Sequence, residues 1–518
     1  MRIRRSLVSA SACIAAMAVI AACSGGNGAA SSGGASSGGT GSTSAPAGAT
    51  DTGATINVGS IYEPQNLDNT AGGGQGVTEA LNGNVYEGLY KLGDDGKVTP
   101  LLATADKVSD DGLTYTFTLR DGVKFHSGAA MTSEDVKFSI EKVLGPDSQS
   151  ARKGDLQVID AVETPDAHTV VVKLKQRSIS LTYNLSYVWI MNHAATNLKT
   201  TEDGTGPYQL GKWQHGSTLS LKRFAGYWGT PAKNGEVVYH YYQDASAENN
   251  ALLAGQLDVI TGEQSPDALA QFDNNPQFTV NNGSSTTKLL LAFNDKVKPF
   301  DNKELRVAIT EAIDRHALLQ SIWGTYGKVT GSMVPPTDPW YEDMSNVYPY
   351  DVAKAKADLA AAGYASGLTF TLDTPNYAPH PTAAAFIKDS LAKIGVTVNI
   401  NIITPDQWYT KVYKNRDFTA TMQEHVNDRD VVWYGNPDFY WGYDNPDVTK
   451  LVDEAESSQT TADQTAKLKQ ANEIIVKDAA SDWMYLYPQI VVSKSTVTGY
   501  PINGLNSQFY AYNITKTK

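Results

Sequence analysis

The chain has 518 residues, of which 41% are hydrophobic and 19% are charged, and its formal net charge is −13. This length and apolar content allow two or three lobes with large cores, and they exclude wholesale disorder. The 55 acidic against 42 basic residues disfavour a nucleic-acid-binding surface, and two cysteines are too few for a disulfide framework.

The first 22 residues have the features of a secretory signal peptide. Arg2, Arg4 and Arg5 give a positively charged start, and an apolar run from Leu7 to Ala22 follows. The run is short for a membrane-spanning helix. A plain cleaved signal or an N-terminal anchor helix would also fit this part of the pattern.

The end of that run, Ile20-Ala21-Ala22-Cys23, resembles a bacterial lipobox. In such signals the cysteine thiol is lipidated and becomes the first residue of the mature protein. The resemblance implies that Cys23 is a lipid anchor at the outer, extracytoplasmic face of the bacterial cytoplasmic membrane. It also assigns residues 1–22 to a lipoprotein signal peptide.

Residues 23–54 are expected to form the anchor and a linker. After Cys23 the segment is almost wholly Ser, Gly, Ala and Thr, a composition that cannot bury a core. Since Cys13 leaves with the signal, the folded part contains no thiol. Cysteine nucleophiles, cysteine zinc sites and disulfides are therefore excluded there.

Strands and helices are predicted in alternation along the folded part. β-Forming residues predict strands at 55–61, 114–119, 169–174, 237–242, 289–293, 368–372 and 396–402. Helical spacing and capping signals predict helices at 77–90, 132–143, through 251–253, from 301 to 313, and at 353–362, 383–394, 447–457 and 461–480. This alternation indicates an α/β protein with at least two lobes.

Motifs of catalysis and metal binding are missing from the folded part. It contains no GxSxG, HExxH, EF-hand loop or P-loop. The eight histidines are scattered, and no two stand three or four residues apart. We therefore expect no enzyme activity, no cofactor and no metal site. A surface-tethered hydrolase with scattered Asp, Glu and His residues is the alternative from another class.

Several stretches of the chain, in this order, resemble one known family: Asn84–Leu89, Ser109–Arg120, Asp121–Gly128, Thr132–Ser139, Gly204–Tyr208, Tyr227–Gly229, Leu252–Val259, Arg306–Arg315, and Lys354–Lys356 with Ala362–Tyr364. The family is that of the extracytoplasmic solute-binding proteins that serve peptide and nickel ABC importers. The resemblance runs from about residue 55 to the C-terminus.

The resemblance implies a periplasmic-binding-protein-like fold, with two lobes, a hinged ligand cleft between them and an extra N-terminal subdomain. One lobe would comprise residues 55–98, 205–290 and 485–518, the subdomain 99–204, and the other lobe 291–484. The implied function is a monomeric, membrane-tethered protein that captures peptides and delivers them to an ABC permease. Binding of an oligosaccharide, another small solute or a metal chelate is the alternative.

Aromatic residues mark the expected cleft wall. Trp433, Tyr434, Tyr440 and Trp441 lie within a short segment rich in turn signals, and Trp408 lies upstream. Aromatic rings on loops of a rigid scaffold are typical of ligand clefts, where they give large contact areas. The alternative interpretation is that these rings are core residues beneath a loop.

Two acids and one tyrosine complete the expected site. In peptide-binding relatives, an Asp in a pattern resembling Asp-Pro-Asp pairs with the ligand's N-terminal ammonium. The corresponding segment of this chain is Asp428-Arg429-Asp430, which lacks the proline. The resemblance therefore implies that Asp428 or Asp430 contacts the ligand's ammonium group. Arg429 could instead neutralise a neighbouring acid. The resemblance also implies that Tyr62, which follows the first strand, faces the cleft, while His425 suggests the metal-chelate alternative.

Overall fold

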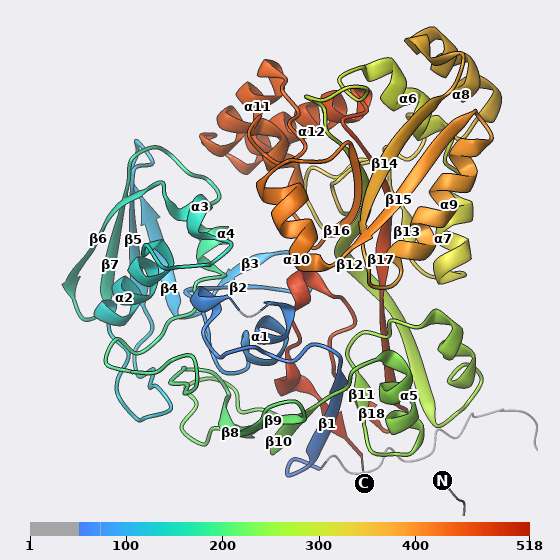
Figure 1. Cartoon of the computed structure of the whole chain (residues 1–518). Coiled ribbons are helices and arrows are strands. Elements are labelled where there is room, and N and C mark those ends of the chain that lie inside the picture. Colours follow the sequence, from blue (N-terminus) through green and yellow to red (C-terminus); the bar gives the residue numbers. More distant parts are fainter. Residues whose placement is uncertain (1–50, 73, 518) are drawn as a thin grey trace, which may run out of the picture. The chain divides into compact units, whose positions relative to one another are not determined.

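The computed structural model of the chain describes residues 51–72 and 74–517 (Figure 1). The predicted signal peptide, Cys23 and the linker up to residue 50 lie outside the described residues. Within the described ranges, no helix has the length and apolar character needed to cross a membrane.

Eleven strands form one mixed sheet. Ten of them follow in the order β15 (Val396–Ile403), β14 (Leu368–Pro375), β16 (Ala420–His425), β12 (Phe278–Phe293), β17 (Ser481–Lys494), β11 (Val259–Ile260), β1 (Thr55–Ser60), β10 (Glu236–Tyr241), β9 (Thr218–Arg223) and β8 (Tyr208–Gln214). The eleventh, β13 (Lys328–Val329), pairs with β17. β1 is parallel to β10 and β11, and β14 is parallel to β15 and β16. The predicted α/β class is confirmed.

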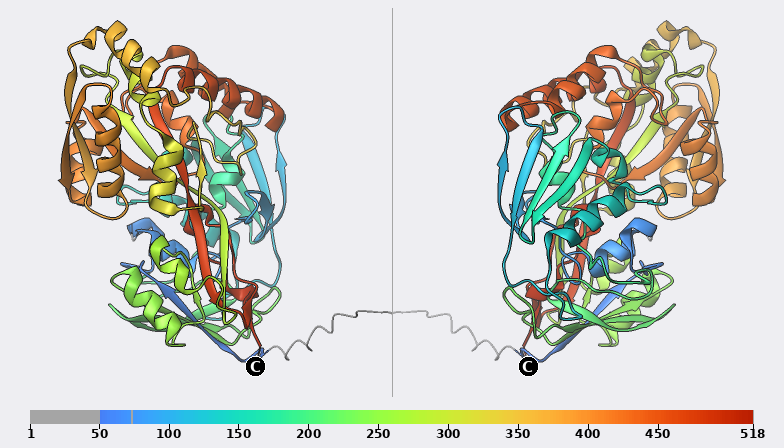
Figure 2. Two further views of the ribbon diagram at one scale, coloured as in Figure 1. Left: turned by 90° about the vertical axis from the view of Figure 1, so that its right-hand side faces the viewer. Right: turned by 90° about the vertical axis from the view of Figure 1, so that its left-hand side faces the viewer.

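The long strands β12 and β17 connect these two groups of parallel strands (Figure 2). They are antiparallel neighbours, and their register shifts between Ser284 and Lys288. On one side of the shift β17 pairs with β11, and on the other side β12 pairs with β16. We call residues 284–288 the waist, because the sheet passes there from one group to the other.

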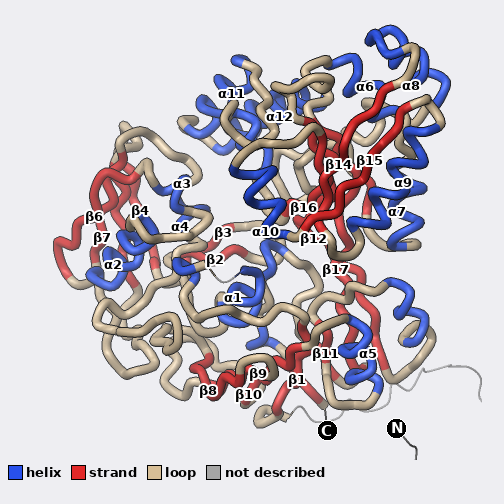
Figure 3. The backbone as a smooth tube through the Cα atoms, in the orientation of Figure 1, coloured by secondary structure: helices blue, strands red, loops and turns tan. Residues whose placement is uncertain are grey.

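Helices cover the sheet on the β14–β15–β16 side of the waist. They are α6 (Lys303–Glu311), α7 (Arg315–Trp323), α8 (Val352–Leu359) and α9 (His380–Ala392), and α9 packs on β14 and β15 (Figure 3). The start predicted for α6 is one residue early. Asn302, and not Asp301, is the N-cap, and its side chain accepts a hydrogen bond from the Leu305 amide.

A separate four-stranded antiparallel sheet lies within residues 103–174. Its order is β4 (Ala103–Val108), β5 (Thr114–Leu119), β7 (Thr169–Leu174) and β6 (Ile159–Asp166). The predictions for β5 and β7 match residue for residue. The helix α2 (Ser133–Leu144) begins at the predicted cap, where the Thr132 amide donates to Asp135 at 2.7 Å.

The helix predicted at 77–90 is wrong beyond Leu81. There α1 (Gly74–Leu81) ends, and Gly83 adopts a left-handed φ of 67°. A Cβ atom at Gly83 would lie 2.4 Å from the ring of Tyr510, so this close turn requires glycine. Leu81, Val85 and Leu89 are nevertheless buried, because the irregular chain still turns them inward.

The remaining helices are α3 (Lys153–Leu156), α4 (Leu181–Leu185), α5 (Ala245–Leu253), α10 (Pro405–Trp408), α11 (Pro446–Glu456) and α12 (Thr461–Lys477). The remaining strands are β2 (Tyr90–Leu92), β3 (Val98–Pro100), β18 (Val497–Thr498) and β19 (Thr515–Lys516). The predicted helices at 447–457 and 461–480 correspond to α11 and α12. These two helices pack against a core that includes Tyr434 and Trp441.

Candidate functional site

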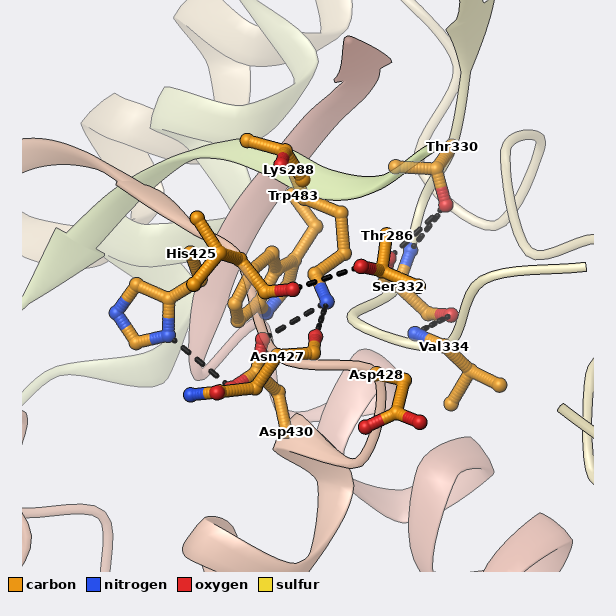
Figure 4. A network of polar contacts seen from close by, with 12 residues as sticks. Thr286, Lys288, Thr330, Ser332, Val334, His425, Asn427, Asp428, Asp430 and Trp483 are labelled. Atoms are coloured by element: carbon orange, nitrogen blue, oxygen red, sulfur yellow. Dashed lines mark hydrogen bonds and ion pairs between the residues drawn. The ribbon is translucent and has the colours of Figure 1, made fainter. Parts of the chain in front are cut away.

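A buried polar network surrounds Lys288 at the waist (Figure 4). The Lys288 side chain has no exposed surface, and its Nζ lies 2.9 Å from Oδ2 of Asp430. Nζ also donates to the carbonyl of Asn427. Beside it, the hydroxyl of Thr286 donates to the carbonyl of Val426 at 2.7 Å. These bonds tie the waist to the loop that follows β16.

Asp430 has its cationic partners inside the protein. Burial raises the pKa of its carboxyl group, but the charges of Lys288 and His425 outweigh burial and lower that pKa below its usual value. The two ring nitrogens of His425 contact Asp430 at 3.2 Å and the Tyr440 hydroxyl at 3.0 Å. This arrangement favours a structural role for Asp430, and its contact with ligand stays a prediction.

Asp428 points towards a different set of neighbours. It accepts a hydrogen bond from the hydroxyl of Tyr183 on α4. The guanidinium of Arg429 lies 3.5 Å from the centre of the Tyr183 ring, and that of Arg152 lies 3.9 Å from the centre of the Tyr187 ring. Asp428 therefore connects the loop after β16 with the α4 region.

Two cavities meet at Asp428 and Arg429. The first has a volume of about 900 Å³, and its walls come from 96–98, 286, 337–340, 428–429, 461–469, Tyr183 and Leu505. The second has a volume of about 710 Å³, with walls from 151–158, 175–184, 427–433 and 452–468. These sizes suit a small molecule or a short peptide.

The aromatic residues predicted for the cleft wall form one cluster. Tyr434 and Trp441 stack with centroids 4.3 Å apart, and Trp408 meets Tyr440 edge to face at 5.7 Å. These four rings are buried, which favours the alternative of core aromatics. Trp433 is half-buried and lines the second cavity. Contact of any of the five with ligand stays a prediction.

Four glutamates that were not among the predicted site residues form what we call the glutamate cluster. They are Glu79 on α1, Glu248 on α5, Glu263 after β11 and Glu424 on β16. Glu79, Glu248 and Glu424 lie near Tyr62, and Glu263 lies near Glu248. Burial, and then the charges of Glu424, Glu79 and Glu248, raise the pKa of Tyr62.

The glutamate cluster is held by neutral hydrogen-bond donors. Glu79 accepts from Ser60 at 3.2 Å and from Thr261 at 2.9 Å, and Glu424 accepts from Tyr377 at 3.3 Å. Burial raises the pKa values of Glu79, Glu263 and Glu424 to about 7. The position of Glu263 and Glu424 in the sequence could have indicated a site. Both stand at carboxyl ends of parallel strands, where α/β proteins bind ligands.

The sequence is similar to known binding proteins over most of its length. A family model described as bacterial extracellular solute-binding proteins, family 5 Middle, matches residues 97–430. The glutathione-binding protein GsiB of Salmonella typhimurium is 30% identical over 463 residues, which covers 82% of this chain and 87% of that protein. GsiB of Escherichia coli O157:H7 is 27% identical, with the same coverage of both chains.

Solved structures of binding proteins share the fold. AgaA from A. tumefaciens R10, in complex with agropinic acid, is 26% identical with a TM-score of 0.76, and the match covers 90% of this chain and 99% of AgaA. DppA from Helicobacter pylori, in complex with the peptide STSA, is 24% identical with a TM-score of 0.76, covering 90% and 98%. The predicted two-lobe, periplasmic-binding-protein-like fold class is confirmed.

Proposed function

The chain belongs to the bacterial extracellular solute-binding proteins, family 5, and from this premise we propose that it captures a peptide between two lobes and delivers it to the permease of an ABC importer. The observation that carries the proposal is the cavity of about 900 Å³. Its walls combine Lys97, Tyr183, Asp338 and Asp428, which come from segments far apart in the sequence. A ligand bound there contacts several parts of the fold at once.

The lobes that we propose are residues 55–98 with 205–290 and 485–518, and residues 291–484, with 99–204 as the extra subdomain. The separate sheet of β4 to β7 supports the subdomain, since it shares no strand with the large sheet. The waist supports the division between the lobes, because β12 and β17 are the only strands among residues 51–72 and 74–517 that continue through it. Bending at these two strands would open and close the cleft.

Closure joins the subdomain to the second lobe through polar contacts. The Ile179 amide donates to the Glu456 carbonyl at 3.0 Å, and the Ser180 hydroxyl donates to the Glu456 carboxylate at 2.7 Å. Tyr183 adds its bond to Asp428. A ligand that contacts both sides adds to these bonds and shifts the population to the closed form, which the permease recognises.

The relatives support a peptide as the class of solute. GsiB is named for binding glutathione, which is itself a tripeptide, and DppA was solved with the peptide STSA. A short peptide fits a cavity of this volume. The protein performs no reaction on its solute in this proposal, and it acts as a monomer.

The proposed anchor is a lipid on Cys23, at the outer face of the cytoplasmic membrane. The lipobox-like sequence before it supports this assignment, as does the Gly/Ser/Ala linker that follows. A flexible linker of this length reaches on the order of 30 Å. The folded part would therefore stay close to the permease while turning freely.

The test uses the mature full-length protein. Native mass spectrometry of the purified protein would show co-purified solutes, and thermal unfolding would be followed with glutathione, a mixed peptide pool and an oligosaccharide pool. A peptide at 100 times its Kd stabilises the folded state by about 2.7 kcal/mol, so the midpoint should rise. A rise with oligosaccharides and none with either peptide sample would reject the proposal.

A further inference from the structure

We propose that the glutamate cluster is a subsite for an organic cation, namely an ammonium or guanidinium group carried by the solute. The inference rests on the proposed function, and it names the class of solute more closely. Glu79, Glu248, Glu263 and Glu424 would surround the cationic group. Tyr62 and Tyr377 would contribute ring faces and hydroxyl groups beside it.

The sheet places two members of the cluster on opposite sides of the β12–β17 pair. Leu289 of β12 pairs with Glu424 of β16 on one side and with Tyr485 of β17 on the other. The Glu263 amide donates to the Ile490 carbonyl, further along β17. Both groups of parallel strands therefore contribute a glutamate at their carboxyl ends, where α/β folds bind ligands.

Glu248 gives the cluster its unpaired acceptors. The residue is 1% exposed, and neither carboxylate oxygen has a hydrogen-bond partner among the described residues. Its carboxylate lies over β1, where a Cβ atom at Gly59 would come within 2.8 Å of Oε1. The buried hydroxyl of Tyr241, at the end of β10, also has no partner in the described part of the chain. Both groups are available to a ligand that donates hydrogen bonds.

The cluster also lacks a positive counter-charge. Several buried acids elsewhere in the protein have cationic partners, such as Asp430 with Lys288 at 2.9 Å and Asp482 with Arg315 at 2.7 Å. Within residues 51–72 and 74–517, no lysine, arginine or histidine forms an ion pair with any of the four glutamates. Buried charges are normally paired, so the missing cation is one that the solute can supply.

An organic cation fits these residues better than a metal ion. Among the described residues, no three carboxylate, histidine or cysteine side chains come close enough together to hold a metal. Widely spaced acceptors suit a guanidinium or ammonium group, which donates several hydrogen bonds in different directions. The faces of tyrosine rings attract the same groups through cation–π interaction.

The experiment compares solutes of similar shape with and without a cationic group, and a cation without a peptide bond. Calorimetric titration of the mature protein would use the tripeptide Ala-Arg-Ala and its citrulline counterpart, in which a neutral ureido group replaces guanidinium. Putrescine, a diamine without a peptide bond, is the third probe. We expect the arginine peptide to bind at least tenfold more tightly than the citrulline peptide.

Two variants assign that preference to the cluster. Burial raises the pKa of Glu248 well above its usual value, so a bound cation would favour the ionised form of this carboxyl group. Glu248→Gln removes a carboxyl group that can ionise beside the cation, and it removes no hydrogen bond within the described part of the protein, so it should abolish most of the preference for arginine. Glu87→Gln is the matched control, because Glu87 is also buried but is bonded to Thr205, Tyr227 and Trp228 outside the cluster. It should leave the preference unchanged.

The outcomes separate this inference from the proposed function. Equal affinity for the arginine and citrulline peptides overturns the cation subsite, while peptide capture stands. If putrescine binds, neither peptide binds, and Glu248→Gln loses putrescine binding, the cation subsite is supported and the proposal of peptide capture is rejected. An unchanged arginine preference in Glu248→Gln also overturns the subsite, and so does the absence of binding by all three probes.

Discussion

Tyr183 and Asp428, which are 245 positions apart in the sequence, are joined by a hydrogen bond from the tyrosine hydroxyl to the carboxylate. Tyr183 belongs to α4, and Asp428 to the loop that follows β16. Both residues line the cavity of about 900 Å³. This bond therefore links the proposed subdomain to the second lobe at the wall of the proposed binding site.

Replacing Tyr183 by phenylalanine should weaken solute binding. A hydrogen bond to a charged group contributes about 1.5–3 kcal/mol, and here that free energy favours the closed form. We expect roughly tenfold or greater loss of affinity, measured by calorimetry with a bound peptide. Tyr443→Phe is the control, because Tyr443 donates to Asp478 at 2.7 Å within one proposed lobe. Equal losses of affinity in both variants would contradict the role in closure.

The two tryptophans of the aromatic segment should respond differently to truncation. Trp441 is fully buried, so Trp441→Ala should reduce the free energy of unfolding by about 3–5 kcal/mol. Trp433 is half-buried at the second cavity, so Trp433→Ala should cost much less stability. Urea denaturation measures both. Similar losses in the two variants would show that Trp433 is also a core residue.

Local signals account for the parts of the fold that could be predicted. The strand β5 alternates β-forming residues, and α2 starts at a cap whose bond from Thr132 to Asp135 spans three residues. Such signals are complete within one short segment. The helix predicted at 77–90 had the right spacing, but the turn at Gly83 depends on packing against Tyr510, which no local pattern reports.

The site was harder to predict because its residues acquire their properties from distant segments. The sequence made Asp430 a candidate contact for the ligand, yet in the structure Lys288 from another strand pairs with it. The sequence around Glu248 does not indicate that this residue is buried, because its burial depends on the close approach of α5 to Gly59. Aromatic composition alone also cannot separate Trp441 in the core from Trp433 at a cavity.

Breaking the ion pair at the waist should destabilise the protein strongly. Lys288 and Asp430 are both fully buried, so Lys288→Met leaves a buried carboxylate without its main counter-charge. Loss of one partner of such a pair costs about 3–5 kcal/mol. The double variant Lys288→Met/Asp430→Asn should recover much of that loss in urea denaturation. A single variant as stable as the wild type would show that the pair contributes nothing.

The stability of the solute-free protein should fall as the pH rises from 6.5 to 8. Glu79, Glu263 and Glu424 have pKa values of about 7 when folded, against 4.5 ordinarily. The folded protein therefore binds more protons than the unfolded chain, and ionisation above pH 6.5 costs on the order of 2 kcal/mol for the three groups.

One buried histidine sets the lower limit of that pH range. Burial lowers the pKa of His380 to about 4, so below pH 6.5 the unfolded chain takes up a proton there that the folded protein does not. This opposes the effect of the glutamates as the solution becomes more acidic. At pH 6.5 the unfolded chain still holds about half a proton on this histidine, and as the pH rises His380 becomes neutral in both states. Its opposing effect therefore fades, and the glutamates determine the trend.

Thermal unfolding of variants assigns the pH dependence to these glutamates. In Glu263→Gln/Glu424→Gln, the fall of the midpoint between pH 6.5 and 8 should be clearly smaller, because two ionising groups are gone. Glu454→Gln, at an exposed position, is the control and should keep the wild-type fall. A double variant with the wild-type slope would show that these two carboxyl groups do not ionise in this pH range.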